Sequence, residues 1–140
     1  MAIVQTQCTI FKVNLLKGLE NFNTGTSYVY KIALYNANAT LDADTLVYST
    51  TDEVTGTGYT AGGKVLSPTI PLSGSNTAYV SFANVTWNPA SFTTRGALIY
   101  NSTSGAAVAV LNFGSDKVAT NTFTSTFPTA DASNAILRIS

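Results

Sequence analysis

The stretch of residues 58–64, GYTAGGK, comes closest in residue type and spacing to a catalytic motif. It fits the G-x-x-x-x-G-K part of a phosphate-binding loop, in which glycine N–H groups surround the phosphates. Such a loop also needs Ser or Thr after the lysine to hold magnesium, and a helix whose N-terminus faces the phosphates. Here Val65 follows, within a proline-interrupted run, KVLSPTIPL, that is typical of strands. We therefore expect no nucleotide site and interpret the glycines as turn residues.

Other catalytic groups are scarce. The sequence contains no histidine, so a histidine cannot activate Cys8 or a serine as a nucleophile. The acid pairs Asp42/Asp44 and Asp52/Glu53 have the residue types of glycoside hydrolysis, but both lie in polar stretches where acids usually form solvated turns. The LDAD motif also lacks the glycine and spaced ligands of a calcium loop. We expect no enzyme, no cofactor and no metal.

The composition favours association with other proteins. Charged residues make up 10% of the 140 positions and the net charge is zero, against about 25% charged residues in a typical domain. Low charge weakens the repulsion between copies. The seven basic residues are spread along the chain, which predicts no nucleic-acid partner. Without an apolar run of about 20 residues we expect no membrane partner, and MAIVQTQC does not resemble a secretion signal.

Residues 1–26 are predicted to form an N-terminal arm with a short helix. An apolar stripe with helical spacing marks the helix, with Thr9 as a candidate cap and Gly18 at its end. The stripe consists of Phe11, Leu15, Leu16 and Leu19.

Residues 27–140 are predicted to form one β-sandwich domain. Eight short strand-like runs, separated by turn signals such as GSDK at 114–117, cover 28–35, 46–50, 64–70, 77–83, 96–100, 106–113, 122–127 and 135–139. The absence of crossover helices favours an all-β, antiparallel, two-sheet sandwich of about eight strands, jelly-roll-like. An immunoglobulin-like sandwich is the competing fold, but its Cys…Trp…Cys pattern is missing. The expected core residues are Ile32, Leu34, Val80, Phe82, Leu98, Val110, Phe123 and Leu137.

Two surfaces are candidates for binding. Residues 2–11 are uncharged and cluster their apolar side chains at both ends, as Ile3, Val4, Ile10 and Phe11. An edge strand would alternate, so we expect a free tail that becomes ordered on a partner. Aromatic residues offer either a sugar-stacking platform or, as we favour, core packing. These aromatics are Tyr48, Tyr59, Tyr79 and Trp87.

Six motifs resemble a family of small virion proteins of tailed bacteriophages. They are FKVNLLKG, YKIALY, EVTGTGYTAGGKVL, RGALIYN, AVLNFGSDK and FPTADASNAILRI, which span nearly the whole chain in the expected order. This chain departs from the family pattern at Asn112, where Asp is usual, and at Thr94, where Ala is usual, which weakens any role for that aspartate.

The resemblance implies a structural virion protein, with capsid cement (a decoration protein) as the best-fitting role. Such a protein is made in the host cytoplasm, lies on the outer capsid surface and clamps neighbouring major capsid protein subunits. Binding at two-fold seams would require an isologous dimer, so we expect self-association as a dimer. The alternative is a host-receptor or glycan-binding β-sandwich module of a tail or head fibre.

Overall fold

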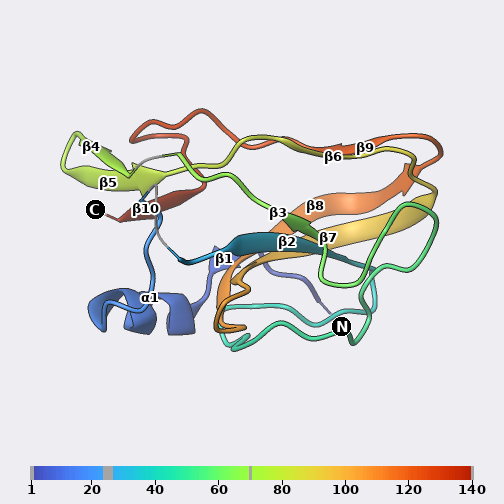
Figure 1. Cartoon of the computed structure of the whole chain (residues 1–140), viewed down its shortest axis with the longest axis horizontal. Helices are drawn as coiled ribbons and strands as arrows, with labels where there is room; N and C mark the ends of the chain where they lie inside the picture. Colours follow the sequence, from blue (N-terminus) through green and yellow to red (C-terminus); the bar gives the residue numbers. More distant parts are fainter. Residues whose placement is uncertain (1, 24–26, 70, 140) are drawn as a thin grey trace.

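Antiparallel strands make up most of the computed structural model, which describes residues 2–23, 27–69 and 71–139 (Figure 1). The largest sheet has the order β1-β8-β7-β2-β3. Its strands are β1 (Thr6–Gln7), β8 (Ala107–Ala119), β7 (Phe92–Asn101), β2 (Tyr30–Tyr35) and β3 (Lys64–Val65). A second sheet contains β10 (Leu137–Ile139), β5 (Thr77–Val80) and β4 (Leu72–Gly74), and β6 (Val85–Trp87) pairs with β9 (Phe123–Ser125).

These sheets form layers. In Figure 1 the two smaller sheets lie along one side of the five-stranded sheet, and the teal-to-green segment 36–63 runs along its other side. The predicted all-β antiparallel sandwich with one short N-terminal helix is confirmed. The two smaller sheets, of three and two strands, do not join into a single sheet in the described residues, so jelly-roll connectivity stays a prediction.

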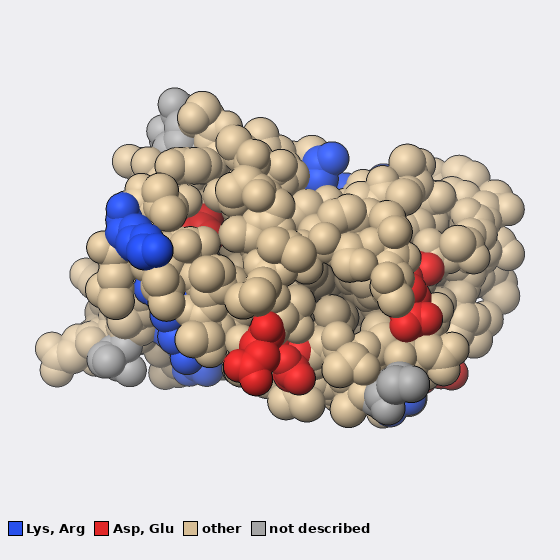
Figure 2. All heavy atoms as spheres, turned by 90° about the horizontal axis from the view of Figure 1, so that it is seen from below, with Lys and Arg blue, Asp and Glu red and all other residues tan. Residues whose placement is uncertain are grey.

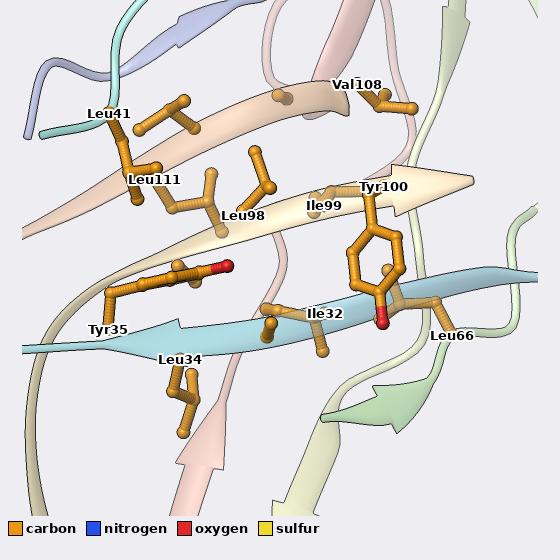
Figure 3. Close-up of a cluster of buried hydrophobic side chains, with 14 of the residues drawn as sticks. Ile32, Leu34, Tyr35, Leu41, Leu66, Leu98, Ile99, Tyr100, Val108 and Leu111 are labelled. Carbon is orange, nitrogen blue, oxygen red and sulfur yellow. The ribbon is translucent and has the colours of Figure 1, made fainter. Parts of the chain in front are cut away.

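The core lies on both faces of β2 and β7. Ile32, Ala33 and Leu34 are all 0% exposed although successive strand residues point to opposite faces. Figure 3 shows Ile32, Leu98 and Ile99 among the buried side chains of neighbouring strands. The sheet is therefore covered on both sides, which the alternating pattern of residues 28–35 does not indicate. The expected core residues are buried except Phe123, which is half-buried.

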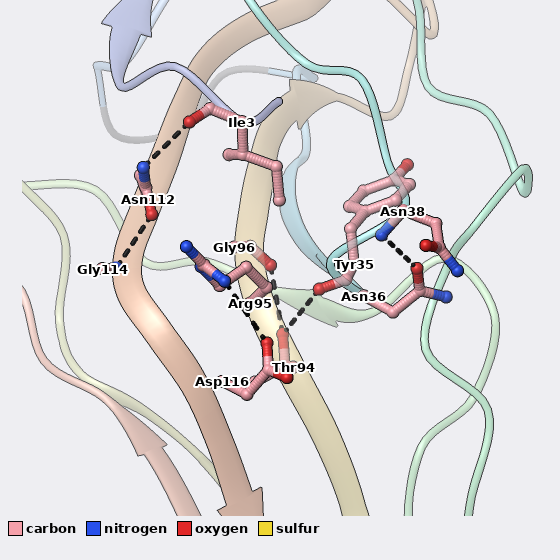
Figure 4. Close-up of polar contacts among 10 residues, drawn as sticks. All are labelled: Ile3, Tyr35, Asn36, Asn38, Thr94, Arg95, Gly96, Asn112, Gly114 and Asp116. Atoms are coloured by element: carbon pink, nitrogen blue, oxygen red, sulfur yellow. Dashed lines mark hydrogen bonds and ion pairs between the residues drawn. The ribbon is translucent and has the colours of Figure 1, made fainter. Parts of the chain in front are cut away.

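Two predicted boundaries are wrong. The GSDK turn at 114–117 lies inside β8, where Gly114 N–H donates to Asn112 Oδ1 at 2.8 Å and Arg95 of β7 pairs with Asp116 at 3.6 Å (Figure 4). Residues 46–50 do not form one of the named strands, and Val47 makes only an isolated bridge with Ala106. The short strands β1, β4 and β6 were not predicted, and position 70 of the predicted run 64–70 lies outside the described residues.

The expectation of a free N-terminal tail is also wrong. Thr6 and Gln7 pair with Val110 and Ala109 as the edge strand β1, and Ile3 forms a parallel bridge with Leu41. Clustered apolar residues at 3–4 and 10–11 did not exclude an edge strand because this strand is only two residues long.

The helix α1 (Thr9–Leu16) forms where a short helix was predicted. Cys8, rather than Thr9, occupies the N-cap position and makes no side-chain cap bond. The predicted stripe is only partly buried: Phe11 is 2% exposed, whereas Leu16 is 92% exposed. At 3.6 residues per turn Leu16 lies on a different side of the helix from Phe11, and Leu19 lies beyond the end of α1.

Candidate functional site

The most distinctive surface of the molecule lies where α1 meets the sheet of β4, β5 and β10. An inner hollow of about 230 Å³ opens between them. Its walls are largely apolar side chains from α1 and the following segment on one side, and from β5 and β10 on the other. They include Phe11, Leu15, Phe22, Val80, Leu137 and Ile139. A hollow with this lining is suited to an apolar group of a binding partner.

An outer hollow of about 580 Å³ continues the same surface. It shares Leu15 and Ile139 with the inner hollow and adds Leu16, Lys12 and Arg138. We call these five residues the α1–β10 surface. Leu16 is 92% exposed and Ile139 is 54% exposed, so two large apolar side chains border the same hollow. Exposed apolar side chains that gather around a hollow mark interaction sites more often than scattered ones do.

Backbone and side-chain bonds hold α1 beside β10. Cys8 N–H donates to Val108 O at 2.9 Å and Thr9 N–H donates to Ala43 O at 2.9 Å, which fixes the start of the helix. Gln7 Nε2 donates to Arg138 O at 3.0 Å and so joins β1 to β10. Because these bonds connect segments from both ends of the chain, the surface exists only in the folded protein.

A buried carboxyl group supports the inner hollow. Glu20 is 8% exposed, and its Oε1 accepts hydrogen bonds from Tyr30 Oη and Asn101 Nδ2, both at 2.9 Å. Burial raises the pKa of Glu20, and the donors Asn101, Tyr30 and Asn14 oppose the rise. Within the described residues Glu20 Oε2 has no hydrogen-bond partner. The segment that lines the hollow is thus held to β2 and β7.

The predicted contact residues Ile3, Val4, Ile10 and Phe11 do not form one exposed surface. Ile3 is 8% exposed and Phe11 is 2% exposed, whereas Val4 is exposed and Ile10 is half-buried. Ile3 O accepts a hydrogen bond from Asn112 Nδ2 at 2.8 Å beside Gly96, as Figure 4 shows. Ile3 and Phe11 therefore contribute to the core of this chain, and Phe11 reaches the surface only as a wall of the inner hollow.

Sequence reasoning found only half of the α1–β10 surface. Leu15 and Leu16 belong to the apolar stripe of the predicted helix, but nothing in the sequence indicates that β10 lies beside them. Arg138 and Ile139 come from a run that was predicted to be a strand, with no signal for which helix it would meet.

The aromatic platform is not an open surface. Trp87 is 1% exposed and packs between Phe92 and Phe123, with ring centroids 6.5 and 5.8 Å away. The hydroxyls of Tyr48 and Tyr59 are both bound to the carboxylate of Glu53. The interpretation of these aromatics as packing residues is confirmed for Trp87, whereas Tyr48, Tyr59 and Tyr79 are half-buried.

The candidate acids have different environments. Asp42 forms a turn, as predicted, because its Oδ1 accepts a hydrogen bond from the N–H of Asp44 at 2.9 Å. The prediction of a solvated acid is wrong for Glu53, which is 7% exposed. Burial raises the pKa of the Cys8 thiol to about 11, which keeps it protonated and unreactive at neutral pH. Among the described residues no group of three or more Cys, Asp or Glu side chains is placed to hold a metal ion.

The glycine run serves the fold, as predicted. Gly62 and Gly63 have φ of 97° and 78°, and strand β3 begins directly after them in place of the helix that a phosphate loop requires. The Lys64 ammonium donates to Thr86 O at 2.7 Å and lies 5.8 Å from the centre of the Trp87 ring. Lys64 is therefore engaged with the neighbouring layer. Within the described ranges, no helix is long and apolar enough to span a membrane.

Comparisons with known proteins returned no relative. No family model matches the chain, and no curated protein or solved structure matches it significantly.

Proposed function

We propose that this chain is a structural virion protein, a capsid cement protein that binds the outside of a phage head and clamps neighbouring major capsid protein subunits. The observation that carries the proposal is the α1–β10 surface, on which Leu16 is 92% exposed and lines the outer hollow. The motif resemblance to small virion proteins of tailed bacteriophages supplies the identity of the partner.

The physical properties of the chain fit this role. With seven basic and seven acidic residues in 140 positions, its surface offers little long-range repulsion to another neutral surface. Figure 2 shows one face on which most atoms belong to uncharged residues. A protein that must cover a shell in many copies benefits from such a surface, because neighbouring copies do not repel one another. Self-association as a dimer at two-fold seams belongs to the same proposal.

The alternative role, a glycan-binding fibre module, has less support. A sugar-stacking site needs an open aromatic face, and Trp87, the largest candidate, is buried at 1% exposure.

The proposal is tested by adding the purified chain to capsids that lack it and counting the bound copies per particle. Wild-type protein is expected to saturate the particles and to raise their resistance to heating. Leu16→Gln, which keeps good helix propensity, should lower occupancy, since it removes an exposed apolar contact. Val118→Gln is the matched control, because Val118 is 69% exposed on β8 and is not part of the α1–β10 surface.

Both variants should melt within a few degrees of the wild type, because neither side chain is buried. If the wild-type chain does not bind capsids, the proposed function is wrong. If it binds and Leu16→Gln binds equally well, the contact lies elsewhere on the molecule.

A further inference from the structure

The α1–β10 surface combines an apolar floor with two cations that form no ion pair among the described residues. Lys12 projects from α1 and Arg138 from β10, and both line the outer hollow. Among the described residues the one salt bridge joins Arg95 to Asp116, at 3.6 Å and elsewhere in the molecule. Arg138 Nη1 donates to Ser133 O at 2.6 Å, which orients the guanidinium without neutralising its charge.

Within the described part of the chain, no acidic side chain forms an ion pair with Lys12 or Arg138. The pKa of the Asp131 carboxyl is lowered mainly by its hydrogen bond with Asn134, and the positive charge of Arg138 lowers it further. Asp131 and Arg138 do not form an ion pair in the described structure. In Figure 2 the largest blue groups lie at the left end, where Figure 1 places α1, with a smaller red group beside them; further blue groups lie toward the middle and the right, and the larger red groups lie there too. The α1 end therefore offers positive charge next to apolar surface.

We propose that the α1–β10 surface binds an acidic amphipathic segment of the partner protein, in which carboxylates flank apolar side chains. This inference rests on the proposed function, in which the partner is the major capsid protein. Apolar side chains of the segment cover Leu15, Leu16 and Ile139 and supply most of the affinity. One of them enters the inner hollow as an anchor.

The carboxylates of the segment contact Lys12 and Arg138. The planar guanidinium of Arg138 binds a carboxylate through two parallel hydrogen bonds, which fixes the direction of the segment. A basic segment with the same apolar pattern is rejected, because it would bring like charges together as water is excluded. The two cations thus select the partner while the leucines and isoleucine bind it.

This proposal is tested without capsids by titrating the isotope-labelled full-length chain with three synthetic amphipathic peptides. The peptides share one pattern of leucines and carry glutamate, glutamine or lysine at the polar positions. Amide chemical shifts report both the site and the dissociation constant. The glutamate peptide is expected to bind about tenfold more tightly than the glutamine peptide, which corresponds to about 1.4 kcal/mol. The shift changes should centre on Leu15, Leu16 and Ile139.

Charge-neutralised variants identify the contacting groups. The double variant Lys12→Gln/Arg138→Gln should bind the glutamate and glutamine peptides equally, and raising NaCl from about 50 mM to about 500 mM should weaken wild-type binding to the glutamate peptide only. Lys117→Gln, which removes one exposed charge on β8, is the control and should preserve the preference.

Equal binding of all three peptides by the wild type, or shift changes elsewhere, would overturn the proposal. Tighter binding to phosphatidylglycerol vesicles than to the glutamate peptide would also overturn it, since the cations would then serve a membrane surface. The capsid-binding experiment is separate: if capsids bind the wild type and the double variant with the same affinity, the cement role stands and the acidic-segment inference fails.

Discussion

The hydroxyl of Tyr59 donates a 2.5 Å hydrogen bond to the carboxylate of Glu53, inside the segment that covers the five-stranded sheet. The other oxygen of Glu53 accepts from the Tyr48 hydroxyl at 2.6 Å, and Gly62 N–H adds a third bond at 2.8 Å. Tyr59 Oη in turn accepts from Leu34 N–H of β2 at 2.9 Å. One carboxylate therefore fixes three positions of the long segment 36–63 and connects it to the sheet.

Removing this carboxylate should destabilise the fold. Glu53→Ala leaves the hydroxyls of Tyr48 and Tyr59 without their acceptor, and we expect the free energy of unfolding to fall by about 1–3 kcal/mol. Urea denaturation followed by Trp87 fluorescence measures the change. Asp44→Ala is the control, since Asp44 is exposed, and it should change the stability by less than about 0.5 kcal/mol. Equal effects of the two substitutions would mean that the Glu53 cluster does not stabilise the fold.

Glu20 should give the protein a pH-dependent stability of a definite sign. Burial raises the pKa of Glu20 in the folded state, so the native protein binds this proton more tightly than the unfolded chain. Its contribution is therefore present below the ordinary glutamate pKa and is lost as the pH rises through the raised value. As the pH rises over this range, the free energy of unfolding of Glu20→Gln should therefore increase relative to that of the wild type.

The opposite sign is expected at Asp131, which serves as the control. Hydrogen bonds from Asn134 and Ser133 lower the pKa of Asp131, so its contribution is present above the ordinary aspartate pKa and is lost as the pH falls through the lowered value. Urea titrations of Glu20→Gln, Asp131→Asn and the wild type from about pH 3 to about pH 7 separate the two effects. Parallel pH profiles for Glu20→Gln and the wild type would contradict a raised pKa at Glu20.

The sequence predicted the fold class because that property depends on local patterns. Strand-like runs, turn residues and one short helical stripe each occupy neighbouring positions. The burial of Ile32, Leu34 and Leu98 follows from them, but the burial of the other face of β2 and β7 does not. The buried state of Glu53 was not predictable in the same way. TTDEV reads as a polar loop, and only the tertiary structure brings two tyrosine hydroxyls and the Gly62 N–H around its carboxylate.

The binding surface was only partly predictable for a related reason. The two leucines of α1, half-buried Leu15 and exposed Leu16, were visible as a stripe, but their neighbours on β10 come from the other end of the chain. The free-tail prediction failed because it weighed the apolar pattern of residues 2–11 alone, whereas an edge strand of two residues needs only an available partner such as β8. β8 continues through GSDK because its residues pair with β7, as Thr94 with Lys117 and Thr93 with Val118, and this cross-strand pairing is not visible in the local sequence.

Two glycines with similar backbone conformations should respond differently to alanine. Gly63 has φ +78° and a Cβ there would lie 1.8 Å from Ile32 O, a backbone atom of β2. Gly105 has φ +83° with nothing within 4 Å of the corresponding Cβ among the described residues. Gly105→Ala should lower the free energy of unfolding by about 1–2 kcal/mol, because alanine is strained in the left-handed backbone conformation. Gly63→Ala should cost clearly more, because β3 must move away from β2. Equal unfolding free energies for the two variants would show that β3 is not packed against β2 as described.

Substitutions at Ile3 and Val4 distinguish a packed N-terminal segment from a free tail. Ile3 is 8% exposed, and its side chain fills the space that Gly96 leaves on β7, where a Cβ would lie 2.9 Å from Ile3 Cδ1. Val4 is 51% exposed. Ile3→Ala should therefore lower the free energy of unfolding by about 2 kcal/mol or more, whereas Val4→Ala should change it by less than about 0.5 kcal/mol.

Amide hydrogen exchange gives an independent measurement of the same segment. Val4 N–H donates to Leu41 O at 2.8 Å and Cys8 N–H to Val108 O at 2.9 Å, so both amides should be protected in the isolated protein. A free tail would leave both amides unprotected and both variants as stable as the wild type. The distinction also bears on capsid binding. For the packed segment, Ile3→Ala should lower the occupancy of capsids only in proportion to the loss of folded protein. Val4→Ala alters an exposed side chain, so a change in its occupancy would report direct contact between this side chain and the partner.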